Sequence, residues 1–188
     1  MTLEELNALD GQSAARELRR CCGSTRWTES MVRARPFPGA EAMADIGDAI
    51  WASLDAGDWL EAFAAHPRIG ETDSGRSGAG ESGGSGGSGG LGKSGESGWA
   101  EQEQSGARAA SEDARKRLAA GNHQYEARFG YIFIVCATGK TVEEMLGILE
   151  DRLQNDPGEE LRIAAEEQRK ITRLRLGKLL GGTRVATT

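Results

Sequence analysis

A segment of 25 residues, Ser74 to Gly98, constrains the fold most, because it contains 12 glycines and 7 serines. Such a segment cannot bury enough apolar surface to offset the entropy lost on ordering, so we expect a flexible surface loop at 74–98. The parts on either side have the pattern of helices that bury their apolar faces by packing against each other. We therefore expect a single domain over residues 1–188, interrupted by this loop. Two independent domains joined by the loop are the less favoured alternative, because the first part has only about 73 residues.

Composition and charge exclude several classes of protein. With 23 Lys and Arg against 29 Asp and Glu, the formal net charge is −6, which argues against a general binder of nucleic acid or of an anionic membrane. No apolar run approaches the roughly 20 residues that span a bilayer, and the first residues lack a signal-peptide pattern, so we expect a cytoplasmic protein. The three cysteines include an adjacent pair, Cys21 and Cys22, so we expect reduced thiols rather than a disulfide framework.

Capping patterns and apolar periodicity predict helices almost everywhere outside the loop. Before the loop we expect helices after the capping box Thr2–Glu5, over Ala14 to Cys22 with Ser13 as cap, from near Thr25 to before Pro36, over Ala40 to Leu54, and after an Asp58 cap up to His66-Pro67. After the loop we expect helices over Trp99 to Ala119 with a break at Gly121-Asn122, after the capping box Thr141–Glu144, and from about Glu159 to Leu180. No pair of strands with a hairpin signal occurs. The sequence therefore predicts a compact, multi-helix, all-α domain.

The stretch Tyr131 to Cys136 is ambiguous. Its residue types are those of a buried strand, but Tyr125, Phe129, Ile132, Phe133 and Cys136 recur at helical spacing. The periodicity leads us to expect a buried helix here.

No motif for nucleotide or structural zinc binding is present. His66 and His123 are the only imidazoles, so a metal site would need carboxylates from unconnected places, and we expect none. His123 is expected on the surface.

His66 is the most informative candidate for chemistry. It ends an apolar helix directly before Pro67, where the helix dipole favours an imidazolium and the proline fixes the exit direction of the chain. An imidazole held there could deliver or accept a proton near pH 7. A histidine that only caps helix carbonyls is the alternative.

Charged residues on two other expected helices are further candidates. Glu101 and Glu103, with Gln102 and Gln104, open the helix after the loop, where carboxylates commonly serve only as partners of the helix dipole. On the last helix, a spacing of 100° per residue places Arg175 on the core-facing stripe and points Arg169 and Arg173 away from it. An inward arginine needs an anionic partner, so Arg175 is either a clamp for an acidic substrate or part of an internal ion pair.

Taken together, the chain resembles the 2-oxo-4-hydroxy-4-carboxy-5-ureidoimidazoline (OHCU) decarboxylase family of urate catabolism. The residues that carry the resemblance are Leu3 to Leu9, Cys22-Gly-Ser-Thr-Arg-Trp27 with Met31, Arg35-Pro-Phe37, His66-Pro-Arg-Ile-Gly70, Trp99 with Glu103-Gln104, Arg128-Phe-Gly130 with Phe133, Arg152-Leu with Asn155, and Ile171 with Arg175-Leu176. Each motif is weak alone, but their order and spacing are specific.

The resemblance implies an all-helical, usually dimeric enzyme without a cofactor, which decarboxylates OHCU, its small-molecule substrate, to (S)-allantoin. It implies that His66 transfers the proton and that Glu103 orients His66 and tunes its protonation. Arg175 would hold the substrate's carboxylate or polar ring. The other substrate-binding segments that the resemblance implies are Pro67, the turn Ala100, Glu101, Gln102 and Gln104, and the backbone of Ile134, Val135, Cys136, Ala137 and Thr138.

Two departures from the family pattern bear on the site. Ala100 stands where the family has a serine, so one hydroxyl contact to substrate is missing. Tyr131-Ile132 replaces the usual Phe-Pro, which would remove a proline kink from the expected helix. The missing serine is the feature that favours an alternative function, a catalytically silent helical interaction domain. A further alternative is that the Gly/Ser loop tethers a neighbouring enzyme.

Overall fold

The computed structural model describes residues 1–68 and 112–181, and the predicted Gly/Ser loop at 74–98 lies outside them. Within the described residues all regular secondary structure is helical, which confirms the all-α prediction. The helices are α1 (Leu3–Ala8), α2 (Gly11–Arg19), α3 (Thr25–Arg33), α4 (Ala40–Ala52), α5 (Ala56–Ala64), α7 (Glu112–Phe129), α8 (Val142–Arg152) and α9 (Pro157–Leu179).

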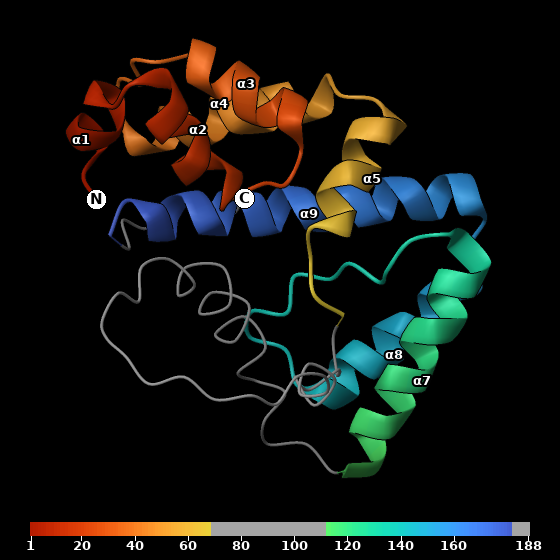
Figure 1. Cartoon of the computed structure of the whole chain (residues 1–188). Helices are drawn as coiled ribbons and strands as arrows, with labels where there is room; N and C mark the ends of the chain where they lie inside the picture. Colours follow the sequence, from red (N-terminus) through yellow and green to blue (C-terminus); the bar gives the residue numbers. More distant parts are fainter. Residues whose placement is uncertain (69–111, 182–188) are drawn as a thin grey trace, which may run out of the picture.

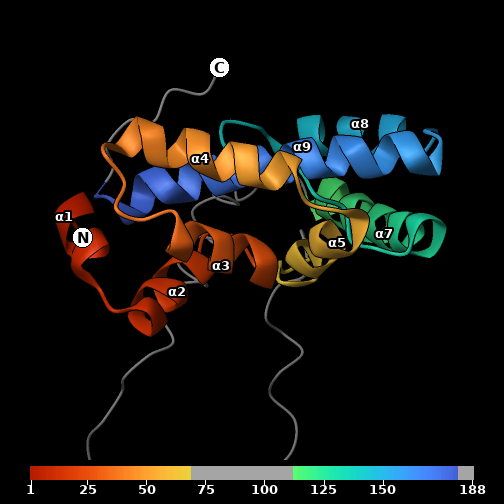
Figure 2. The same ribbon diagram turned by 90° about the horizontal axis from the view of Figure 1, so that it is seen from above.

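The long helix α9 is the axis of the molecule (Figure 1). Helices α1 to α4 lie on one side of it, whereas α7 and α8 lie on the other side, against its N-terminal half. The view from above shows α4 running alongside α9 (Figure 2). The amino group of Met1 donates a hydrogen bond of 3.2 Å to the Leu179 oxygen, so the start of the chain is attached to the end of α9.

Two hydrophobic clusters result from this arrangement. The first lies between α1–α5 and α9, and it includes the fully buried Trp27, Met31, Met43 and Phe63. The indole nitrogens of Trp27 and Trp51 donate to the backbone oxygens of Gly47 and Ala165, at 3.0 and 2.9 Å. The second cluster joins α7 to α8.

The helix caps agree with the sequence in part. The capping boxes at Thr2 and Thr141 are both formed, as predicted. The prediction that Ser13 and Asp58 are N-caps is wrong, because Asp10 and Asp55 are the N-caps of α2 and α5. In each case an acidic residue lies three positions upstream, and its side chain accepts a hydrogen bond from the backbone N–H of the residue predicted to be the cap.

Helix α7 continues through Gly121 and Asn122, so the predicted break is wrong. Gly121 instead permits close packing, because a Cβ there would lie 2.5 Å from Leu149 Cδ2 on α8. The Asn122 side chain donates a hydrogen bond of 3.0 Å to the Leu118 oxygen one turn earlier, so its amide has a partner within the helix.

The predicted buried helix over Tyr131 to Cys136 is also wrong. Helix α7 ends at Phe129, Gly130 adopts a positive φ of 82°, and the chain then runs extended beside α9 (Figure 1). Ile134 and Cys136 belong to the first hydrophobic cluster, while Phe133, Val135 and Ala137 belong to the second. Successive side chains of an extended segment point to opposite sides, so the segment 131–138 packs into both cores at once.

Candidate functional site

His66 lies in the turn that follows α5, as the sequence predicted. Its backbone N–H donates to the Phe63 oxygen at 3.0 Å. The turn is packed tightly against the loop between α2 and α3, because a Cβ at Gly23 would lie 2.4 Å from the Cβ of Ala65. Beyond Pro67, Arg68 forms two hydrogen bonds of 3.0 Å with the Glu126 carboxylate and so joins this turn to α7.

The surroundings of His66 favour the neutral form of its imidazole at pH 7. Burial lowers its pKa to about 3, and the positive charge of Arg175 acts in the same direction. The neighbouring side-chain amide of Gln168 acts in the opposite direction. The sequence-based expectation was that the helix dipole favours an imidazolium, whereas burial of the imidazole acts in the opposite direction.

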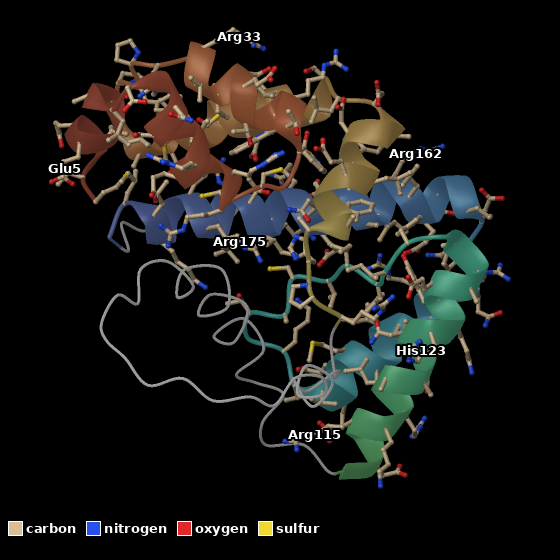
Figure 3. All side chains as sticks on the ribbon, viewed as in Figure 1. Glu5, Arg33, Arg115, His123, Arg162 and Arg175 are labelled. Atoms are coloured by element: carbon tan, nitrogen blue, oxygen red, sulfur yellow. The ribbon has the colours of Figure 1, made fainter. Side chains whose placement is uncertain are left out.

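Arg175 lies on the face of α9 turned away from α1–α4 (Figure 3), close enough to His66, Cys21 and Cys22 for its charge to lower the pKa of each. It is half-buried. Arg175 and His66, which come from different elements, are thus within range of each other's charge.

Arg173 does not point away from the core, as the helical spacing predicted. Its side chain is 7% exposed and forms ion pairs with Glu41, Asp45 and Asp48 of α4, the latter two at 3.0 and 2.9 Å. Arg169 also contacts Asp48, at 2.5 Å. The helical-spacing prediction assumed that α9 buries a single apolar stripe. It failed because other helices cover α9 on two faces.

The segment Ile134–Thr138 is fixed by side chains that contact its backbone. Glu167 accepts a hydrogen bond of 2.7 Å from the Cys136 N–H, and Lys140 Nζ donates to the Cys136 oxygen at 2.8 Å. Val135 and Ala137 direct their side chains into the second cluster, and Thr138 is exposed. Only the Ile134 and Cys136 side chains share the first cluster with α5 and α9.

Arg152 fixes the same segment from a buried polar cluster. Its guanidinium donates to the Ile134 oxygen at 2.8 Å and to Glu160 Oε1 at 2.6 and 2.8 Å. Glu160 also accepts from the Tyr125 hydroxyl and, at 2.7 Å, from the Asn155 amide. Arg152, which the sequence singled out only through the family resemblance, thus holds the segment, and Asn155 contacts the same Glu160 carboxylate.

The sequence analysis missed three residues next to His66 and Arg175. Gln168 and Thr172 lie on α9, two turns and one turn before Arg175, respectively, and both are buried. Cys22 lies beside Thr172 and Arg175, and burial raises the pKa of its thiol to about 12. The spacing of Gln168, Thr172 and Arg175 at i, i+4 and i+7 is the signal that could have found the first two.

Other predicted site residues lie outside the described residues: Ala100, Glu101, Gln102, Glu103 and Gln104. His123 is exposed on α7, as predicted, and lies far from Arg175 (Figure 3).

All three cysteines are free thiols. Across residues 1–68 and 112–181, no group of three or more His, Cys, Asp or Glu side chains is placed to hold a metal ion. In the same part of the chain no helix is both long and apolar enough to cross a membrane.

Comparison with known proteins finds one family. Residues 7–177 match the model of the OHCU decarboxylase family. The chain is 40% identical over 160 residues to the uric acid degradation bifunctional protein TTL of Arabidopsis thaliana, a match that covers 85% of this chain and 45% of the relative. It is 39% identical over 80 residues to the 2-oxo-4-hydroxy-4-carboxy-5-ureidoimidazoline decarboxylase of Amia calva, covering 43% and 46% of the two chains. The matches thus span about half the length of these curated relatives.

Solved structures agree with this assignment. A crystal structure of OHCU decarboxylase in the presence of (S)-allantoin superimposes with a TM-score of 0.69 at 38% identity, covering 88% of this chain and 97% of that one. A crystal structure of (S)-allantoin synthase superimposes with a TM-score of 0.66 at 18% identity, covering 96% and 54%, which supports the fold alone.

Proposed function

The chain belongs to the OHCU decarboxylase family, and we propose that it decarboxylates OHCU to (S)-allantoin in urate degradation, with His66 supplying the proton stereospecifically. The observation that carries this proposal is the His66 imidazole, whose Nε2 atom is buried and whose pKa the charge of Arg175 lowers, on a turn fixed by contacts with the α2–α3 loop and α7. In this reading the enzyme is a carboxy-lyase that uses no cofactor.

The reaction needs one proton at one face of the product. When the bond between the ring carbon and the carboxylate breaks, CO2 leaves and the electron pair stays on the ring carbon as an enolate-like carbanion. A fixed imidazole then transfers a proton to one face of that carbon, which sets the handedness of allantoin. Because the low pKa favours a neutral imidazole at pH 7, His66 takes up this proton from water in the substrate complex, where the substrate's negative charge favours the imidazolium.

Arg175 is the group that holds the substrate's carboxylate or polar ring. A guanidinium in a partly dehydrated position binds an anion through charge-assisted hydrogen bonds. Pro67 and the backbone of Ile134 to Thr138 complete the binding surface. The attachment of the 134–138 segment through Arg152 and Glu167 supports this role.

Glu103 orients His66 and tunes its protonation, and the turn containing Ala100, Glu101, Gln102 and Gln104 contacts substrate. These roles rest on the family resemblance. We further propose that residues 1–188 form one domain interrupted at 74–98, that the protein acts as a homodimer, and that it works in the cytoplasm.

A catalytically silent interaction domain with the same fold is the second candidate, favoured by Ala100 in place of the family's serine. The rate at which purified protein consumes freshly generated OHCU separates the two functions. A rate far above spontaneous decay supports the decarboxylase. A folded protein that leaves the decay rate unchanged overturns it.

A further inference from the structure

Gln168 is a buried amide placed beside His66 and has no role in the mechanism above. Its side chain is fully buried on α9. It interacts with the imidazole strongly enough to oppose part of the pKa shift of His66. The packing of α5, which His66 follows, against α9 also makes the two side chains neighbours, although they come from elements about 100 residues apart.

The hydrogen bonds of Gln168 orient its amide. The Nε2 group donates to Thr172 Oγ1 at 3.1 Å, one turn further along α9. That bond directs the Oε1 atom away from Thr172. Among the described residues Oε1 is buried and has no hydrogen-bond partner.

His66 also has a buried nitrogen atom without a hydrogen-bond partner among the described residues. This atom is Nε2. A neutral imidazole carries one N–H donor, and an amide oxygen is an acceptor only. Buried polar atoms are almost always paired, so two unpaired atoms of complementary type on neighbouring side chains point to a bond that a side-chain rotation can close.

We propose that Gln168 is a positioning residue for His66: its Oε1 atom accepts a hydrogen bond from Nε2–H and so fixes the imidazole tautomer with Nδ1 unprotonated. Nδ1 is then the nitrogen that exchanges a proton with a bound substrate. Thr172 takes part indirectly, because it holds the amide in the orientation that presents oxygen to the imidazole. The catalytic consequence rests on the proposed function, whereas the tautomer does not.

The tautomer can be measured directly, because the chain has only two histidines. In a 15N-labelled His123→Gln variant, His66 gives the only imidazole signals in a long-range 1H–15N correlation spectrum at pH 7. The proposal expects a protonated Nε2 and an unprotonated Nδ1. A spectrum with the proton on Nδ1 overturns it, whatever the protein's activity.

Two substitutions of similar size test the role of the amide. Gln168→Met removes the acceptor and should allow both tautomers to be populated. Gln168→Glu places a carboxylate at the imidazole and should raise the pKa of His66, which appears as an imidazolium at pH 7. The exposed Gln154→Met is the matched control and should leave the spectrum unchanged. A Gln168→Met spectrum identical to that of the parent overturns the proposal.

Comparison of kcat with KM distinguishes a positioning role of Gln168 from a loss of packing. With OHCU as substrate, Gln168→Met should lower kcat by at least about tenfold with little change in KM, since correctly placed proton transfer contributes about 10²- to 10⁴-fold. An unchanged kcat, or a change in KM alone, contradicts the positioning role. If the parent protein does not consume OHCU, the proposed function fails while the tautomer result still stands.

Discussion

Arg152 donates a hydrogen bond of 2.8 Å to the backbone oxygen of Ile134, and through it a buried ion pair holds the extended segment of the proposed site. The same guanidinium is paired with Glu160, whose side chain is fully buried. It also lies over the Phe133 ring at 4.8 Å from the ring centroid. The segment is thus fixed to α8 and α9 even though it forms no helix itself.

Removal of Arg152 should therefore be costly. We expect Arg152→Met to lower the free energy of unfolding by about 3–5 kcal/mol, because it leaves the Glu160 carboxylate buried and without its counter-charge. Urea denaturation measures the change. The exposed pair Arg117 and Glu150, at 2.8 Å, provides the control: Arg117→Met should cost less than about 1 kcal/mol. Similar losses for both variants would contradict this account.

Gly23 should be needed for the position of the His66 turn. A methyl group there would collide with Ala65, so we expect Gly23→Ala to cost about 1–3 kcal/mol and to lower activity. The double variant with Ala65→Gly restores the space and should recover most of both losses. Gly147→Ala is the control, since nothing lies within 4 Å of its added Cβ and a helix interior favours alanine. Thermal melts and OHCU turnover rates test this, and failure of the double variant to recover would count against it.

The low pKa of His66 should make stability depend on pH. Its unfolded pKa is near 6.5 and its folded pKa about 3, so the unfolded state binds the extra proton first. Between these values the free energy of unfolding should fall as pH falls, by about 1.4 kcal/mol per pH unit from this group alone. Above pH 6.5 the contribution is constant.

The His66→Gln variant isolates that contribution. Urea denaturation of both proteins from pH 4.5 to 7.5 should show a shallower slope for the variant below pH 6.5. Parallel curves over the whole range would mean that His66 has no depressed pKa.

Arg175 and Arg162 should differ sharply as binding residues. Arg175→Met should raise KM for OHCU by about 10- to 100-fold, the value of a hydrogen bond to a charged group, with a smaller effect on stability. Arg162 is exposed on the same helix, so Arg162→Met should leave KM unchanged (Figure 3). Steady-state kinetics at a fixed pH measures both. An unchanged KM in Arg175→Met would assign that side chain to an internal ion pair instead.

The sequence was most informative where structure depends on near neighbours. The capping boxes at Thr2 and Thr141 are local, and both predicted their helices correctly. His66-Pro67 likewise ended its helix as expected, because the proline restricts the residue before it.

Distant packing explains the main failures. Tyr131 to Cys136 has helical spacing, but two separate cores bury alternate side chains and so favour an extended chain. The missing Phe-Pro dipeptide therefore removes no helix kink there. Arg173 was predicted to face solvent because a single stripe cannot represent a helix covered on two faces. Gly121 looked like a helix break, yet it is required by contact with Leu149.

The sequence likewise identified only some residues of the candidate site. His66 and Arg175 were identified from helix positions, and in the structure the charge of Arg175 lowers the pKa of His66. Gln168 shares a helix face with Arg175 by its spacing in the sequence, but that spacing does not show that its amide oxygen is buried without a partner among the described residues.

The handedness of the allantoin formed is the most direct measurement of the central claim. OHCU is generated from urate by the two preceding enzymes, and circular dichroism follows the product with wild-type protein and with His66→Ala. Spontaneous decay gives racemic allantoin, so rapid formation of the (S) form with wild type, lost in a folded His66→Ala variant, is the predicted result. Racemic product at the spontaneous rate with folded wild-type protein would contradict it.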